Sequence, residues 1–172
     1  MRGGIQISNI IIDGYNLIGV SHRDLKKQRD MLIDSLIKYK KRKGHEIIVV
    51  FDGWKTGAAQ ETRMTVGGIR VIYSRIGDMA DVVIKRIISS ERHEWIVVTS
   101  DRDIAHYAWT SGSIPISAED FLRVCERNTS FGYAEEEKEW GSEEESVSPR
   151  RKGNPRRLSK KEKAIMRALN KL

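Results

Sequence analysis

Six aspartates stand at or shortly after the ends of apolar runs, and their type and spacing make them the residues best suited to chemistry. They are Asp13, Asp52, Asp78, Asp81, Asp101 and Asp103. Carboxylates packed together repel one another unless cations neutralise them. Oxygen ligands with few nitrogen donors suit Mg²⁺ or Mn²⁺. If the fold brings these side chains together, a hard divalent cation is the economical explanation.

The elements that would position them follow from the periodicity of residues 5–128. Short β-branched runs alternate with segments of helical spacing, which is typical of a parallel sheet covered by helices. Strands are predicted at 7–12, 46–52, 69–74, 95–100 and 114–116. Helices are predicted at 24–43, about 78–90, about 102–111 and from Ser117 onwards. Because parallel strands present their carboxyl ends at one edge, where α/β folds bind ligands, we expect the aspartates to surround one crevice.

A purely structural role for the same aspartates stays open. Aspartate at a strand-to-helix junction is a common helix N-cap, and Asp13 with Gly14 forms an ordinary turn pair. Capping fits Asp78 best and also suits Asp101, whereas Asp81 is already inside the predicted helix. The sequence leaves the capping and the metal-binding interpretations side by side.

Charge is distributed unevenly along the 172 residues. The chain has 31 Lys and Arg against 24 Asp and Glu, a net charge of +7. Residues 1–133 carry +4, residues 134–146 carry −6 and residues 147–172 carry +9. Any attraction to a polyanion is therefore concentrated in the C-terminal tail.

Several classes of protein are disfavoured by the sequence. The longest apolar stretch, 47–51, is far too short to cross a membrane, and no signal-peptide pattern is present, so we expect a cytoplasmic protein. The single cysteine, Cys125, excludes an internal disulfide, and the four histidines never fall at i,i+4 spacing. No G-x-G-x-x-G motif follows the first strand and no Walker A loop occurs, which argues against a nucleotide cofactor.

Five segments carry a resemblance to a known family. They read IIIDGYNLIG (10–19), VVFDG (49–53), DMADVVIKRI (78–87), VVTSDRDI (97–104) and ISAEDFLRVCE (116–126). In this order, over about residues 8–127, they resemble the NYN domain of the PIN-like nucleases, and most closely the YacP-like bacterial ribonucleases. The resemblance implies a Rossmann-like, PIN-like parallel sheet with strand order 3-2-1-4-5, flanked by helices, and metal-dependent endoribonuclease activity.

The resemblance also implies roles for single residues. Three acids would hold Mg²⁺ or Mn²⁺ and support catalysis: Asp13, Asp81 and Asp101. Asp78 and Asp103 would complete the metal site by orienting metal-bound water. Asp52 would support the ligands without binding the metal itself. Asn16 would orient the phosphate or a water molecule. The expected reaction is hydrolysis of single-stranded RNA by metal-activated water, which leaves 5′-phosphate and 3′-hydroxyl ends.

The loop between Gly53 and Gly68 is a candidate for gripping RNA. Trp54 would stack on a base while Lys55 and Arg63 contact phosphates. The alternative is a plain long hairpin or crossover loop whose tryptophan packs on the body.

Composition and charge predict three parts of the chain: a nuclease domain (1–129), a disordered acidic-to-basic linker (130–157) and a basic amphipathic helix (158–172). Ser159 and Glu162 form a capping-box pattern ahead of an apolar stripe at Ile165, Leu169 and Leu172. We expect a flexible charged arm that binds mRNA or rRNA, with the ribosome as a further candidate partner. The alternatives are a solvated extension or a helix docked on the body. The predicted RNA contacts of the basic arm are Arg150, Arg151, Arg156, Arg157, Lys160 and Lys161.

A second function remains compatible with these observations. A non-catalytic RNA-binding or ribosome-associated module could keep the fold and the basic tail without turning over a substrate. Metal discriminates between the two, because chelation abolishes the activity of the enzyme but leaves the affinity of the binding module.

Overall fold

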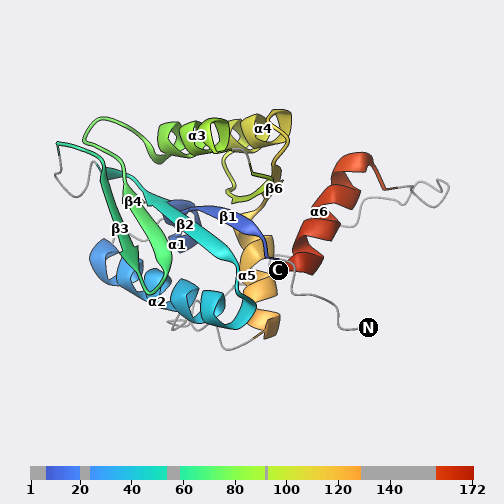
Figure 1. Ribbon diagram of the computed structural model, residues 1–172, viewed down its shortest axis with the longest axis horizontal. Coiled ribbons are helices and arrows are strands. Elements are labelled where there is room, and N and C mark those ends of the chain that lie inside the picture. Colours follow the sequence, from blue (N-terminus) through green and yellow to red (C-terminus); the bar gives the residue numbers. More distant parts are fainter. Residues whose placement is uncertain (1–6, 20–23, 54–58, 92, 129–157) are drawn as a thin grey trace, which may run out of the picture.

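A six-stranded sheet organises the protein, seen here in a computed structural model that describes residues 7–19, 24–53, 59–91, 93–128 and 158–172 (Figure 1). The strands are β1 (Asn9–Asp13), β2 (Glu46–Phe51), β3 (Thr62–Val66), β4 (Ile69–Tyr73), β5 (Trp95–Val98) and β6 (Ile114–Ile116). Their spatial order is β3-β4-β2-β1-β5-β6. The five predicted strands are all parallel and follow the expected order 3-2-1-4-5, which is confirmed.

The sixth strand, β3, was not expected and lies within the predicted loop 53–68. It pairs antiparallel with β4 at the sheet edge, and Gly67 and Gly68, both with positive φ, make the turn between them. Four of its five residues are exposed. With no buried run to mark it, this strand gives only a weak sequence signal.

Helices cover both faces of the sheet. They are α1 (Gly14–Ile18), α2 (Leu25–Lys43), α3 (Ala80–Ser90), α4 (Arg102–Thr110), α5 (Ala118–Asn128) and α6 (Lys160–Lys171). In Figure 1, α3 and α4 lie over one face and α2 over the other. Along β1, Ile11 packs toward α3 and α4, whereas Ile10 and Ile12 pack into the opposite core with α2 and α5. Burial on both faces explains the unbroken isoleucine run.

The short helix α1 replaces the turn that Asp13 and Gly14 suggested. Asp13 is its N-cap, and Gly14 is its first residue. A Cβ atom at Gly14 would lie 2.2 Å from the Phe51 ring, so only glycine lets the helix begin this close to β2. The close approach fixes where the chain leaves the end of β1.

The C-terminal helix α6 has the predicted capping box and packs against β6 and α5. Ala168 and Leu172 are buried in the core, and the Tyr39 hydroxyl donates a 2.9 Å hydrogen bond to the Leu172 carbonyl oxygen. The structure thus shows the docked helix, the alternative left open above, in place of a free arm. Docking removes apolar surface of the stripe from water, which favours the docked helix over a solvated one. The predicted linker 130–157 lies outside the described residues.

No helix in the described part of the chain is both long enough and apolar enough to span a bilayer.

Candidate active site

A cleft of about 330 Å³ opens at the carboxyl edge of the sheet. Its lining comes from the ends of β1 and β2 and the starts of α1, α3 and α4, and includes four of the six aspartates. They are Asp13, Asp52, Asp81 and Asp101. The expectation that acids gather at this edge is borne out for these four, whereas Asp78 and Asp103 do not line the cleft.

Asp13 is the most buried acid of the cleft, with only 8% of its surface exposed. Its carboxylate accepts hydrogen bonds from the Asn16 main-chain N–H (3.4 Å) and side-chain amide (3.1 Å). Burial raises the pKa of Asp13 to about 6; the Asn16 hydrogen bonds oppose this rise, while the negative charges of Asp52 and Asp101 add to it. The carboxylate is therefore held in a place where negative charge is costly without a cation.

Asn16 joins two strand ends. Its Nδ2 donates to Asp13 at the end of β1, and its Oδ1 accepts the Ser100 N–H at 3.1 Å from the segment after β5. The second amide hydrogen has no partner among the described residues. Asn16 therefore positions Asp13, and its spare N–H leaves the predicted contact with a phosphate or water available.

Asp52 caps a helix from a neighbouring strand. Its Oδ1 accepts the Ala80 N–H at the start of α3, whose own N-cap residue, Met79, makes no side-chain capping bond. The prediction that Asp78 caps this helix is therefore wrong. The cap comes from a residue 28 positions earlier in the chain, a distance that local capping rules do not cover.

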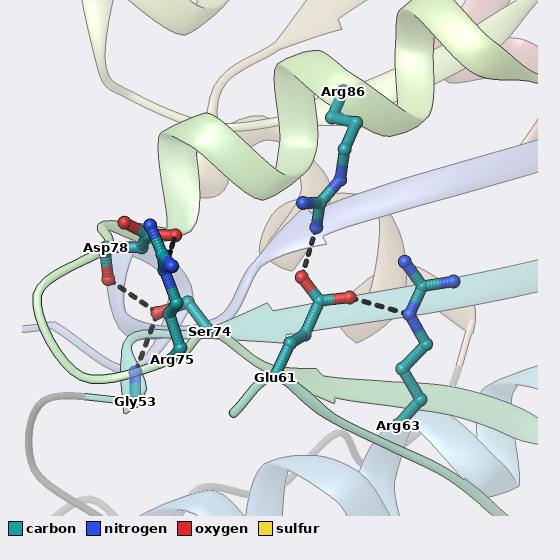
Figure 2. Close-up of polar contacts among 7 residues, drawn as sticks. All are labelled: Gly53, Glu61, Arg63, Ser74, Arg75, Asp78 and Arg86. Atoms are coloured by element: carbon teal, nitrogen blue, oxygen red, sulfur yellow. Dashed lines mark hydrogen bonds and ion pairs between the residues drawn. The ribbon is translucent and has the colours of Figure 1, made fainter. Parts of the chain in front are cut away.

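Asp78 instead holds the turn before α3 (Figure 2). Its carboxylate pairs with Arg75 at 2.7 Å, and its carbonyl oxygen accepts the Ser74 hydroxyl at 2.6 Å. The same hydroxyl oxygen accepts the Gly53 N–H at 2.9 Å. A Cβ atom on Gly53 would fall 1.4 Å from the Ser74 carbonyl oxygen, so this junction of β2 and β4 requires glycine.

Asp101 is the N-cap of α4, as the capping interpretation allowed. One of its oxygens accepts the N–H groups of Asp103 (2.8 Å) and Ile104 (3.1 Å). The Thr99 hydroxyl oxygen accepts the Asp101 N–H at 3.1 Å and also lies 3.5 Å from an Asp13 oxygen. The side chain of Asp103, in the first turn of α4, is exposed outside the cleft lining. Capping and cleft-lining roles thus coincide in Asp101.

Asp81 lies in the first turn of α3, where its carboxylate accepts the Val82 N–H at 2.7 Å. The Lys85 ammonium lies 3.4 Å from its other oxygen. Lys85 therefore partly neutralises Asp81, whereas Asn16 and Thr99, which contact the Asp13 carboxylate, are uncharged.

The carboxylate oxygens of the cleft are ligands that suit a hard divalent cation. The second oxygens of Asp52 and Asp101 have no hydrogen-bond partner among the described residues, and the acids offer oxygen ligands only. In the same part of the chain, however, no group of three or more His, Cys, Asp or Glu side chains is close enough to hold a metal ion. Mg²⁺ commonly binds through one or two carboxylates, with water and substrate phosphates completing its shell. The residues fit a cation bound in that way.

The residues predicted to contact RNA are only partly described. Trp54 and Lys55 lie outside the described residues, as do Arg150, Arg151, Arg156 and Arg157. Arg63 lies on β3, where its Nε donates to Glu61 at 2.6 Å, away from the cleft lining. Lys160 and Lys161 are exposed in the first turn of α6, and the Lys161 ammonium lies 5.3 Å from the centre of the Trp109 ring.

Two supporting residues were missed at the sequence level. Thr99 stands two positions before Asp101, and this Thr-x-Asp spacing could have indicated its contact with the Asp101 N–H. Arg29 donates a 2.9 Å hydrogen bond to the hydroxyl of Tyr15, which lines the cleft, and its guanidinium lies 5.6 Å from the Tyr73 ring centre. No short-range signal marks Arg29, because its partners come from other elements.

A parallel α/β sheet in this strand order, with acids gathered at its carboxyl edge, agrees with the class of PIN-like nuclease folds. The chain belongs to the family of YacP-like NYN domains, whose match spans residues 10–171. This is a nuclease family. The match runs beyond the segment 8–127 that carried the resemblance, so α6 is part of the family domain.

Two solved structures support the assignment. The chain is 27% identical to a single-substitution mutant of Rae1 (YacP) from Bacillus subtilis, covering 70% of this chain and 76% of that one, with a TM-score of 0.57. Rae1 (YacP) without the substitution is 26% identical, with 70% and 75% covered and a TM-score of 0.56. A search of curated proteins finds no match.

Proposed function

We propose that the protein is a divalent-metal-dependent endoribonuclease that hydrolyses phosphodiester bonds of single-stranded RNA. The observation that carries the proposal is the buried Asp13 carboxylate, which lies with Asp52 and Asp101 in one cleft and has its pKa raised to about 6. A cation would relieve the cost of that charge. Membership of a nuclease family supports the same conclusion.

The residues of the cleft have separate tasks in this proposal. Asp13, Asp81 and Asp101 would surround the Mg²⁺ or Mn²⁺ ion, one or two of them binding it directly and the others through water, with Asp52 beside them. The bound ion would supply an activated water and would neutralise charge on the scissile phosphate. Asn16 and the Thr99 hydroxyl keep the Asp13 carboxylate in place through their contacts of 3.1 and 3.5 Å. We expect 5′-phosphate and 3′-hydroxyl products.

The predicted contacts outside the cleft extend the proposal. Trp54 and Lys55, and the basic residues of the tail, stay predicted RNA contacts. On α6, the exposed Lys160 and Lys161 would meet an RNA backbone from a docked helix. Messenger or ribosomal RNA is the expected partner, the ribosome is a further candidate, and a cytoplasmic location is expected.

The experiment is a cleavage assay with the full chain and end-labelled single-stranded RNA, in Mn²⁺, in Mg²⁺ and in excess EDTA. Internal cuts that need the metal and leave 5′-phosphate ends support the proposal. If the RNA stays intact in both metals, or is cut equally in EDTA, the proposal fails.

The second candidate is a non-catalytic RNA-binding module. It is favoured by one observation: the acids of the described residues do not form a ready three-ligand metal site. RNA binding that is unchanged by EDTA, without cleavage in either metal, would establish this alternative.

A further inference from the structure

Three arginines gather on the face of the β3–β4 hairpin that looks toward α3, and we call Arg63, Arg70 and Arg86 the arginine cluster. Arg63 is paired across the hairpin with Ile72, which packs in the core under α3, so both side chains share that face. Arg70 precedes Ile72 by two residues and shares the face as well. Arg86 approaches from α3 (Figure 2).

Two glutamates hold the cluster in place. Glu61 accepts from Arg63 and Arg86 with its two oxygens, and Glu91 accepts from both terminal nitrogens of Arg70 at 3.0 and 3.1 Å. Burial acts to raise the pKa of Glu61, but its two arginine partners outweigh this and hold it below the usual value; Arg70 lowers the pKa of Glu91. Both acids therefore stay charged.

The acids lie beneath the guanidinium groups. The glutamate side chains are 19% and 31% exposed, while the arginine side chains are 47% to 61% exposed. Three positive charges face two negative ones, which leaves an excess of +1 on the outer side. Arg63, Thr65 and Arg70 also line a surface cavity of about 190 Å³. The N–H groups of these arginines that the glutamates do not engage form a preoriented set of donors at the surface.

Stability alone is a weak reason for this cluster, because exposed ion pairs contribute little to folding. Arginine, in contrast, presents a planar fork of donors that matches the oxygens of a phosphate. The glutamates limit the freedom of the side chains, which reduces the entropy lost when a phosphate binds.

The elements that carry the arginine cluster also lead to the acidic cleft. Tyr73 pairs with Phe51, just before Asp52, and Thr62 pairs with Tyr73, so the hairpin reaches the same carboxyl edge. Helix α3 carries Asp81 in the cleft and Arg86 five residues later, about 8 Å further along the helix axis. Helix α3 therefore contributes one residue to the cleft and one to the arginine cluster.

We propose that the arginine cluster is a binding site for backbone phosphates of the RNA strand outside the scissile bond. The inference rests on the proposed function, since it takes RNA as the ligand of the acidic cleft. Of its three residues, sequence reasoning pointed only to Arg63; Arg70 and Arg86 join it through the hairpin and α3.

The test compares the double variant Arg63→Gln/Arg70→Gln with Arg123→Gln in the full chain. Arg123 on α5 is the control for one such substitution, because it is 61% exposed and ion-paired with Glu119; the double variant removes two arginines, so its effects are compared per charge removed. Binding of labelled single-stranded oligouridine is measured in EDTA over a range of salt concentrations. We expect the double variant to bind at least about tenfold more weakly. Its log–log salt slope should fall by about 1.4, since each phosphate contact on a single strand contributes about 0.7.

Arg123→Gln should match the wild type in both affinity and slope. Wild-type affinity and slope in the double variant, with folding verified by circular dichroism, would overturn the inference. A loss in the control of about half that in the double variant, which is the same loss per charge removed, would also overturn it, because the effect would then be one of net charge alone. Cleavage by the wild type in Mn²⁺ is measured alongside, so that failure of the proposed function is seen separately.

Discussion

Replacing Asp13 by asparagine should stabilise the metal-free protein at neutral pH. The pKa of Asp13 rises from 3.8 to about 6 in the folded state, mainly because the carboxyl is buried, with Asp52 and Asp101 adding repulsion. A raised folded pKa means that the folded state holds its proton more tightly than the unfolded state. Folding therefore loses stability as pH rises from about 4 to about 6, by about 3 kcal/mol in total.

Asparagine keeps the shape of the side chain and is as good an N-cap for α1. It loses one acceptor for the two Asn16 donors, at a cost of about 1 kcal/mol. The variant should therefore be more stable than the wild type by about 2 kcal/mol at about pH 7. Near pH 4, where the wild-type carboxyl is protonated, it should be equal or slightly less stable.

Urea denaturation in EDTA at several pH values between about 4 and 8 measures this difference. Asp34→Asn is the control for the loss of one negative charge, because Asp34 is an exposed acid on α2. A difference between the wild type and Asp13→Asn that is constant from pH 4 to pH 7 would refute the reasoning. So would a variant less stable than the wild type at pH 7.

Three further outcomes are expected. Gly53→Ala should lower the free energy of unfolding by about 3 kcal/mol or more, since the new methyl group would overlap the Ser74 carbonyl oxygen 1.4 Å away. Denaturant melts measure this, and wild-type stability would contradict the close packing of Gly53 on Ser74. Asp81→Asn should slow RNA cleavage about 100-fold, whereas Asp78→Asn, outside the cleft lining, should stay within a few-fold of the wild type. If a cleavage time course gives the reverse ranking, the catalytic site lies nearer the turn before α3 than proposed. Tyr39→Phe should cost about 1 to 2 kcal/mol, because it removes the 2.9 Å hydrogen bond to the buried Leu172; an unchanged melt would mean that α6 is held by other contacts.

The parallel core of the fold was predictable because its signals are local and strong. Continuous isoleucine and valine runs mark strands buried on both faces, and the chain order of strands and helices then limits the topology. Ser159 and Glu162 predicted the start of α6 for the same reason, since a capping box needs only four residues. What the helix packs against depends on contacts with distant residues such as Tyr39.

The candidate site was predictable at the level of the sheet edge and less so in detail. Asp13 and Asp101 follow strands directly, so their convergence comes from the topology. The cap that Asp52 gives to α3 spans 28 residues, and the exclusion of Asp78 depends on its ion pair with Arg75. Helix α1 was missed because five residues beginning with glycine have little helical propensity. The close approach of Gly14 to the Phe51 ring, which requires glycine there, is a contact between residues far apart in the sequence.

The measurement that tests the central claim most directly is the single-turnover rate of single-stranded RNA cleavage in Mn²⁺, compared between Asp13→Asn and the control Asp34→Asn. A buried carboxylate that helps to hold a catalytic cation predicts a loss of at least about 100-fold for Asp13→Asn in a folded protein. Asp34→Asn should cleave at the wild-type rate. Wild-type cleavage by Asp13→Asn in saturating Mn²⁺ would contradict the claim that this cleft performs the chemistry.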